Sequence, residues 1–321
     1  MLRPHPGADR ARTPVRTALL NARAQTEPAA VVAAFAPALF VVLWSSGFVG
    51  TKIGLRDSPP LTLLTMRFAG AAILLVCLAW YFKVRWSRDP RTVAHLLVAG
   101  MLIHAGYVGF SFEANAMGMP VSILSLIGVL QPVLTALGAA WLLHERVSIL
   151  QWIGLALGCA GVALVLLDRV AFVPTLPMVA CAFASTLALT VGTLYQKRYC
   201  ADTDLLSGTA MQLAAATILV GVIGTMREAP PVDWQPSFVA ALVWLTIVNS
   251  VISTLMLYWL IRRGAASRVT SLFYLVPVAT SIMGYILVDE AFGRYFLVGA
   301  VVTICGVMLA LRARGSRAGG C

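Results

Sequence analysis

Long apolar stretches with almost no charge recur along this 321-residue chain. Each is at least 17 residues long and holds at most one charged residue. An α-helix needs roughly 20 mostly apolar residues to cross the hydrocarbon core of a bilayer. We therefore predict ten transmembrane helices, at approximately 33–51, 61–82, 92–112, 120–143, 147–167, 172–196, 205–226, 238–261, 269–288 and 295–311.

The composition agrees with this pattern. Hydrophobic residues make up 60% of the chain and charged residues only 12%, a balance unlike that of soluble domains. Helices suit a bilayer because each satisfies its own backbone hydrogen bonds. The predicted fold class is thus an all-α integral membrane protein, whose main surroundings are the lipid bilayer.

The basic residues are distributed unevenly across the predicted membrane. With the N-terminus in the cytoplasm, 18 of the 24 lysines and arginines lie on the cytoplasmic side, five lie in outer loops, and Arg67 alone lies inside a helix. Cytoplasmic loops normally carry such an excess. We predict a multi-pass protein of a bacterial-type inner (plasma) membrane, with both termini in the cytoplasm.

The net charge of +11 raises the alternative of nucleic-acid binding. The basic residues are instead spread over loops and tails, so we predict no nucleic-acid partner. Residues 1–29 are predicted to form a disordered basic cytoplasmic tail, and residues 313–321 a second cytoplasmic tail. The six cysteines form no CxxC pair, which indicates neither a disulfide framework nor a zinc site.

A shift of 145 residues superimposes one half of the sequence on the other. It relates a proline, an acid, a lysine, a serine and three glycines to identical residues, which chance matches among apolar residues would not produce. The pairs are Pro132 and Pro277, Glu145 and Glu290, Lys52 and Lys197, Ser122 and Ser267, Gly47 and Gly192, Gly154 and Gly299, and Gly161 and Gly306.

This repeat predicts an inverted duplication. Each half holds five predicted helices, an odd number, so the second half must cross the membrane in the opposite sense to the first. We place the first five-helix repeat at residues 30–168 and the second at 169–312. Inverted repeats are typical of secondary transporters, with the substrate bound near the midplane between the halves.

Several stretches resemble a known family. LQPVLTALGAAWLLHERVSILQWIGLALGCAGVALVL and its repeat LVPVATSIMGYILVDEAFGRYFLVGAVVTICGVMLAL resemble the second half of an EamA domain of the drug/metabolite transporter superfamily. LWSSGFVGTKIGL and PPLTLLTMRFAGAAILL resemble the family's first two helices. The resemblance covers roughly residues 33–312, and it implies an exporter-like fold of two EamA-like repeats.

Arg67 is the charge predicted to lie deepest in the membrane, about six residues inside the second helix, or roughly 9 Å along its axis. Charges at such depth usually face the interior of the bundle or a water-filled path. Arg67 either binds a carboxylate or phosphate of the substrate or serves structurally, by reaching the headgroups or holding free carbonyls. Its repeat partner is Gln212.

Other polar or aromatic residues within apolar runs are candidate substrate contacts or contacts between helices. His104 is either a proton acceptor or a contact between helices. Pro132 and Pro277 are predicted to bend their helices, either as packing features or as hinges. Besides Arg67 and Gln212, the substrate-binding candidates are Trp44, Ser45, Ser46, Tyr107, Gln131, Tyr195, Asn249 and Tyr274.

Two further groups of residues suggest structural roles. Glu145 and Glu290 stand at helix ends, where an acid that caps the start of the following helix is favoured over a transport role. Gly154, Gly158 and Gly161 would allow close packing of helices, and they make a homodimer a further possibility.

The sequence lacks the motifs of other functional classes. It has no Walker loop, HExxH or GxSxG pattern, and no acid inside a predicted helix core, so we predict no catalytic residues, no metal site and no cofactor. The favoured function is a secondary transporter, with export implied by the resemblance, of a small polar metabolite such as an amino acid. The alternatives are a multidrug or quaternary-cation exporter using an aromatic cage, a duplicated channel, and an intramembrane enzyme.

Overall fold

The computed structural model describes residues 35–119, 124, 127–166, 173–228, 232–288 and 293–312, and no β-strand occurs among them. By its internal contacts the chain divides into residues 1–39 and residues 40–321. In the first unit the described residues, 35–39, are helical. The second unit contains all the features analysed below. The all-α prediction is confirmed for the described residues.

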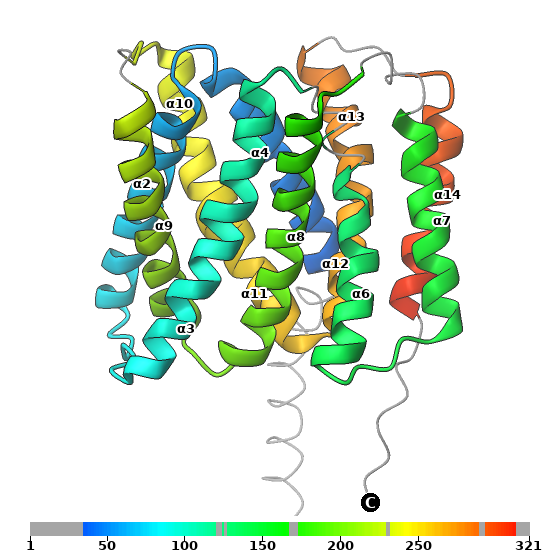
Figure 1. The fold of residues 1–321 in the computed structure, drawn as a ribbon, viewed down its shortest axis with the longest axis horizontal. Coiled ribbons are helices and arrows are strands. Elements are labelled where there is room, and N and C mark those ends of the chain that lie inside the picture. Colours follow the sequence, from blue (N-terminus) through cyan, green and yellow to red (C-terminus); the bar gives the residue numbers. More distant parts are fainter. Residues whose placement is uncertain are drawn as a thin grey trace, which may run out of the picture. The chain divides into compact units, whose positions relative to one another are not determined.

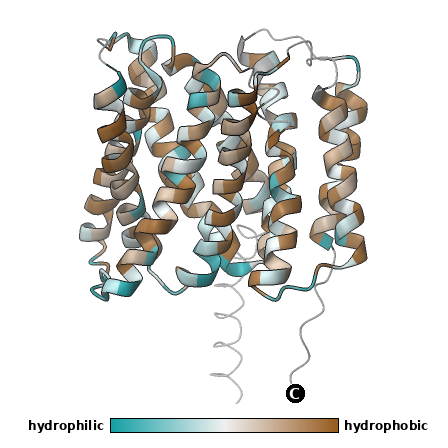
Figure 2. Ribbon diagram, viewed as in Figure 1, coloured by the Kyte–Doolittle hydropathy of each residue, from teal (hydrophilic) through white to brown (hydrophobic). Residues whose placement is uncertain are grey.

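Seven helices in the described part of the chain are long and apolar enough to cross a membrane. Figure 2 shows hydrophobic residues along their middle turns and hydrophilic residues mainly towards their ends. The seven are Phe35–Gly54, Pro60–Tyr81 (α2), Pro90–Ala116, Leu176–Tyr199 (α8), Leu205–Arg227 (α9), Pro236–Arg263 and Ala266–Met283.

Three further apolar helices are shorter. They are α6 (Leu130–Leu142), α7 (Ile149–Leu166) and α14 (Phe296–Arg312), with 13, 18 and 17 residues. A helix perpendicular to the bilayer needs roughly 20 residues to span it. By length and composition, seven helices of the described part are candidate membrane spans, and the apolar stretch Ile149–Val165 of α7 falls one residue short of the shortest of them, whereas the sequence predicts ten.

Two of the long helices change type at their centres. Each contains a π-helical segment, in which the hydrogen bonds run from residue i to i+5 and the chain is locally wound more widely. The hydropathy pattern predicts uninterrupted helices here and does not reveal these segments. The first helix consists of α3 (Pro90–Gly100), η1 (Met101–Gly106) and α4 (Tyr107–Ala116), and the second of α10 (Pro236–Trp244), η3 (Leu245–Ser253) and α11 (Thr254–Arg263).

The two repeat-related prolines lie in the first turns of α-helices. Pro132 is the third residue of α6, and Pro277 is the third residue of α13 (Leu275–Val288). The first backbone N–H groups of a helix have no intrahelical acceptor, so proline loses little there. The helix changes one turn before each proline, at residue 129 and at η4 (Ser271–Tyr274), and the bend predicted at the prolines stays a prediction. Before α13 the chain forms α12 (Ala266–Thr270) and the 3₁₀ segment η4 (Ser271–Tyr274).

Helices α7 and α14 pack side by side through glycine (Figure 1). A Cβ atom on Gly154 would collide with backbone atoms of Gly306 and Ala310, and one on Gly161 would collide with those of Gly299 and Thr303. Residue numbers fall along α14 as they rise along α7, so the two helices run antiparallel. The glycine stripe therefore packs within the chain, and a homodimer stays a prediction.

Helices α2 and α9 form a second close pair, and a carboxylate joins their ends. Glu228, which follows α9, accepts hydrogen bonds from the backbone N–H groups of Leu61 (2.9 Å) and Thr62 (2.8 Å) at the start of α2. It thereby satisfies donors that a helix start leaves free. Phe68 of α2 and Leu213 of α9 belong to one buried hydrophobic cluster. This packing fixes the position of α2, the helix that carries Arg67.

Some predictions concern residues outside the described part of the chain. The two tails, at residues 1–29 and 313–321, are among them, and so are Ser122 and Glu290. Their predicted roles stay predictions.

Candidate functional site

A cavity of about 640 Å³ lies among helices from both halves of the sequence. Its wall includes residues at one end of the helix Phe35–Gly54, such as Lys52, and Asn115 near the end of α4. It extends inward to Arg67 and His104. Lys52, which the sequence places in an outer loop, is helical and lines this cavity. A volume of this size can hold a small metabolite.

Arg67 of α2 lies on the cavity wall and is only 7% exposed. Its Nε donates to Ser250 Oγ (2.6 Å), and its Nη2 donates to Asn249 Oδ1. Among the described residues no carboxylate forms an ion pair with it. Arg67 is thus a buried cation whose polar partners among the described residues are neutral.

The π-helical segment η3 explains how two consecutive residues reach the same guanidinium group. In an α-helix, neighbouring side chains point about 100° apart around the axis. A π-helix holds more residues per turn, so neighbouring side chains point closer together. Ser253 Oγ donates to Val248 O (2.9 Å), five residues earlier, so its side chain follows the wider winding of this segment. Asn249 and Ser250 can therefore both face Arg67.

Aromatic side chains form another part of the wall. Trp44 packs edge-on against Phe273 (ring centroids 5.2 Å apart). It lies nearly parallel to Tyr107, with centroids 6.4 Å apart and a 20° angle between the planes. Apolar residues such as Phe48 and Leu189 also line the cavity. The site therefore offers a large apolar surface beside one buried cation.

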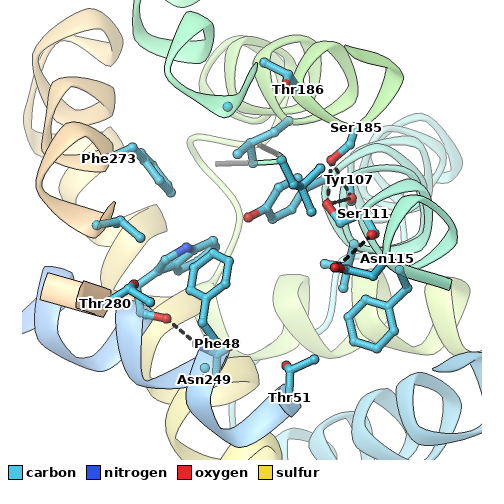
Figure 3. Close-up of a pocket in the computed structure, with 18 of the residues that line it drawn as sticks. Phe48, Thr51, Tyr107, Ser111, Asn115, Ser185, Thr186, Asn249, Phe273 and Thr280 are labelled. Atoms are coloured by element: carbon cyan, nitrogen blue, oxygen red, sulfur yellow. Dashed lines mark hydrogen bonds between the residues drawn. The ribbon is translucent and has the colours of Figure 1, made fainter. Parts of the chain in front are cut away.

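A hydroxyl cluster between α4 and α8 was not predicted. Ser111 Oγ and Ser185 Oγ lie 2.7 Å apart, and each also lies 2.8 Å from the carbonyl oxygen of Tyr107. Asn115 Nδ2 donates to Ser111 O (3.1 Å). Figure 3 shows this cluster across the cavity from Phe273 and Thr280. Serine and threonine are common in membrane helices, so their presence alone does not indicate a site. Identifying Ser111 and Ser185 requires knowing which face of each helix points to the cavity, and the sequence does not give that.

Helices α6 and α13 contribute polar atoms that have no partner among the described residues. Gln131 Nε2 donates to Thr135 Oγ1 (3.3 Å), while Gln131 Oε1 and Thr280 Oγ1 have no hydrogen-bond partner there. Gln131, Thr280 and Pro277 line the cavity, and Pro132 does not. Buried polar atoms without partners carry an energetic cost, which is why most are paired.

Five of the predicted candidates do not line the cavity: Ser45, Ser46, Tyr195, Gln212 and Tyr274. Their side chains contact other parts of the bundle. Ser45 Oγ donates to Val276 O (3.5 Å), Ser46 Oγ accepts from Trp244 Nε1 (3.0 Å), Tyr195 Oη lies 2.6 Å from His95 Nδ1, and the Tyr274 ring fills the space beside Gly158.

Gln212, the repeat partner of Arg67, belongs to a closed hydrogen-bond network. Its Nε2 donates to Gln196 Oε1 (2.7 Å), and its Oε1 accepts from Tyr258 Oη (2.6 Å). Tyr258 Oη also lies 3.3 Å from His104 Nε2. Here side chains of the protein satisfy one another, whereas Arg67 faces the cavity. The two repeat-related positions therefore lie in different surroundings, and only Arg67 belongs to the cavity wall.

A second polar cluster surrounds Glu145, where the ends of α6 and α8 meet the start of α12. None of its residues lines the cavity. Glu145 Oε1 accepts from Lys197 Nζ (2.7 Å) and from the backbone N–H of Ala266 (3.2 Å). Its Oε2 accepts from Ser267 Oγ (3.4 Å), and Lys197 Nζ also donates to Gly264 O (2.5 Å). Instead of capping the helix that follows it, Glu145 joins the ends of α6 and α8 to the start of α12.

The described residues contain no group of three or more histidine, cysteine, aspartate or glutamate side chains arranged to hold a metal ion. The cavity wall carries the buried cation Arg67, the exposed cation Lys52, hydroxyl and amide groups, and aromatic surfaces. Such a wall can recognise a small molecule that combines an anionic group with an apolar part.

Comparison with known proteins identifies a family. The model of the EamA-like transporter family matches twice, at residues 30–167 and 176–312. A solved crystal structure superimposes with a TM-score of 0.76 at 23% identity, covering 87% of this chain and 97% of the other, which shows similarity of fold alone.

Several named proteins are similar over most of their length. The transporter YvbV of Bacillus subtilis is 25% identical over 85% of this chain and 89% of its own. The inner membrane transporter YedA of Escherichia coli K12 is 25% identical over 84% and 87%. A protein of the same E. coli strain, described as a probable amino-acid metabolite efflux pump, is 27% identical over 84% and 92%.

Proposed function

The chain belongs to the EamA-like transporter family, and from that premise we propose that it is a secondary transporter that exports a small polar metabolite bearing an anionic group, such as an amino acid. Membership makes it a helical membrane transporter. The substrate class, the direction and the mechanism are the content of the proposal. The inner membrane is the proposed location, in keeping with the similarity to YedA.

The proposed architecture is ten transmembrane helices in two inverted five-helix repeats. The packing of α7 against α14 supports it. The 145-residue shift relates Gly154 to Gly299 and Gly161 to Gly306, while the contacts join Gly154 to Gly306 and Gly161 to Gly299. Such crossed pairing is what a twofold axis in the membrane plane produces between equivalent antiparallel helices.

The π-helical segments provide a second argument for this architecture. η1 covers residues 101–106, which the same shift relates to residues 246–251 inside η3. An irregularity at equivalent positions of two halves is expected if both descend from one duplicated unit. The three shorter helices would cross the membrane in this arrangement, with neighbouring loops or local thinning of the bilayer accommodating the mismatch.

The environment of Arg67 is the observation that carries the proposed substrate class. A buried guanidinium on a cavity wall, with neutral hydrogen-bond partners only, favours a ligand that brings a negative charge. The same charge disfavours quaternary cations, although Trp44, Tyr107 and Phe273 could otherwise surround one. An amino acid fits, and one similar protein is described as a probable amino-acid metabolite efflux pump.

The proposed mechanism is alternating access between the two repeats. In the described conformation the cavity wall reaches Lys52, near the end of the helix Phe35–Gly54, and Asn115, near the end of α4. The Glu145 cluster joins the ends of α6 and α8 to the start of α12. With the termini in the cytoplasm, the helix ends near Lys52 and Asn115 are on the outer side and the Glu145 cluster is on the cytoplasmic side. Export would require the cytoplasmic side to open and the outer side to close in the opposite state.

Counterflow in proteoliposomes would test this proposal. Purified protein would be reconstituted with an unlabelled amino-acid mixture inside, and the accumulation of each radiolabelled amino acid would be followed against protein-free liposomes. We expect saturable accumulation that depends on an internal substrate, as a carrier requires. Non-saturable flux would indicate a channel, and chemical conversion of the solute would indicate an enzyme. Absence of accumulation for every anionic or zwitterionic solute tested would contradict the proposed substrate class.

A further inference from the structure

Both ends of the Asn249 side-chain amide are occupied within the protein. Its Oδ1 accepts from Arg67 Nη2, and its Nδ2 donates to the backbone oxygen of Trp44 (3.2 Å). A side chain at Gly47 would collide with this amide, so Gly47 leaves the space that it fills. Asn249 is 8% exposed. Its oxygen holds Arg67, and one of its N–H groups holds the helix Phe35–Gly54.

The partners of Arg67 accept from two of its five N–H groups without cancelling its charge. Ser250 Oγ and Asn249 Oδ1 are neutral acceptors. Aspartate has nearly the shape of asparagine, and a carboxylate at position 249 would form an ion pair with Arg67. In a site shielded from water such a pair is strong, and it would compete with any anion from the cavity. The neutrality of Asn249 therefore has a consequence for binding.

We propose that Asn249 is a positioning residue that orients Arg67 while leaving its positive charge for the substrate, whose anionic group supplies the missing counter-charge. The segment η3 makes this possible, because it directs Asn249 and Ser250 to one guanidinium group. This inference rests on the proposed function. It adds that the charge selectivity of the site is set by an uncharged residue acting through Arg67.

The inference predicts the effect of one nearly isosteric substitution. Asn249→Asp would supply the counter-charge from within the protein, so the site would lose its preference for anions while remaining folded. A purely structural role of Asn249 predicts a different result. In that case a lost hydrogen bond would weaken the binding of charged and uncharged ligands alike.

The probes are 3-phenylpropionate and its uncharged counterpart 3-phenylpropanamide, which match the aromatic wall and differ in charge. Isothermal titration calorimetry on the full-length protein in nanodiscs would measure both dissociation constants. We expect the unaltered protein to prefer the anion and Asn249→Asp to lower anion affinity about a hundredfold, as expected for a competing charge a few ångströms away. Asn249→Asp also loses the hydrogen bond to Trp44 O, so some fall in unfolding temperature is expected, and the readout is the ratio of anion to amide affinity, which should fall about a hundredfold.

Two variants of Ser250 complete the design. Ser250→Asp also places a carboxylate beside Arg67, and it gives a second test if Asn249→Asp does not fold. Ser250→Ala removes one neutral acceptor and adds no charge, so it should lower the affinity for both probes and keep the preference for the anion. An anion preference retained in the folded aspartate variants would overturn the inference.

Measurements on Arg67→Gln show whether a negative result concerns only the role of Asn249 or the anion-binding site of the proposed function as well. If the unaltered protein prefers the anion and Arg67→Gln removes that preference while the aspartate variants keep it, the anion site stands and the role of Asn249 is wrong. If the unaltered protein binds anion and amide equally, both the anion-selective site and the inference are wrong.

Discussion

At the scale of single residues, Arg67 is the side chain on which the proposed function depends most. Its guanidinium lies on the cavity wall with two neutral partners. Removal of a buried charge that contacts a ligand charge typically costs 2–5 kcal/mol, so Arg67→Gln should weaken substrate binding roughly a hundredfold. Arg67→Lys keeps the charge and loses the planar fork, so an intermediate loss of about tenfold is expected. Calorimetry with the transported solute would measure this order.

Thermal unfolding in the same detergent distinguishes the roles of Arg67. If Arg67→Gln loses binding and keeps its unfolding temperature, the arginine acts on the substrate. A fall in expression and unfolding temperature together with transport would instead indicate a structural clamp between α2 and η3. Normal binding in Arg67→Gln would show that the substrate lies elsewhere.

The sequence indicates some residues of the cavity and misses others for a physical reason. Polar or aromatic side chains within apolar runs are conspicuous, and Trp44, Arg67, Tyr107, Gln131 and Asn249 all line the cavity. Their roles in binding stay predictions. Polar side chains that point away from the cavity stand out in the sequence in the same way. Gln212 is an example, because its hydrogen bonds go to Gln196 and Tyr258. Burial depends on how each helix is rotated, which composition does not determine.

At the scale of helices, Pro132 and Pro277 mark the first turns of α6 and α13. Replacing either with alanine would let the preceding segment continue as regular α-helix, without losing a hydrogen bond. We expect the variants to fold with little change in unfolding temperature, while the transport rate falls several-fold because the cavity wall at α13 changes shape. The effect should be larger for Pro277, which lines the cavity, than for Pro132. Full transport by both variants would reduce the prolines to packing features.

The Glu145 cluster provides a test of closure at the proposed cytoplasmic side. Glu145→Gln keeps an acceptor for the N–H of Ala266 and removes the charge that pairs with Lys197. The loss of this half-buried pair should cost roughly 1–2 kcal/mol and favour opening at this end. A cysteine at position 266 in inside-out vesicles should then react several-fold faster with a membrane-impermeant thiol reagent.

The ion pair between Glu113 and Arg227 is the matched control. Its nitrogen and oxygen lie 2.6 Å apart, and the side chains are 32% and 60% exposed. Glu113→Gln removes a charge of the same kind elsewhere in the bundle, so it should leave the reaction of Ala266→Cys unchanged. Equal rates in the two glutamine variants would show that the Glu145 cluster does not hold the end closed.

The hydropathy pattern predicts where the long apolar helices lie, but it does not predict their internal irregularities. It located the long apolar elements, because the bilayer requires about 20 consecutive apolar residues. It did not reveal η1 or η3, since a π-helical turn changes the winding of the backbone and leaves the composition unaltered. It also treated the region around Pro132 as one helix, whereas α6 begins at Leu130.

At the scale of the whole molecule, the asymmetry of basic residues predicts which side of the membrane each loop faces. The loop before α3 contains Lys83, Arg85 and Arg88 and is predicted to be cytoplasmic. Arg227, at the end of α9, is predicted to be on the outside. In intact spheroplasts, a membrane-impermeant maleimide should therefore label Arg227→Cys and miss Arg88→Cys. Inside-out vesicles should give the reverse pattern.

The native cysteines determine how this topology experiment is controlled. Burial raises the pKa of the Cys200 thiol to about 11, so at neutral pH it is protonated and reacts slowly with maleimide. Cys77 and Cys305 lie on apolar helices, where a charged reagent has poor access. Labelling of the unaltered chain gives the remaining background. Strong labelling of Arg88→Cys in sealed spheroplasts would contradict the cytoplasmic placement of this loop, and labelling of both positions from the same side would contradict the ten-helix inverted architecture, because that architecture places the two loops on opposite sides of the membrane.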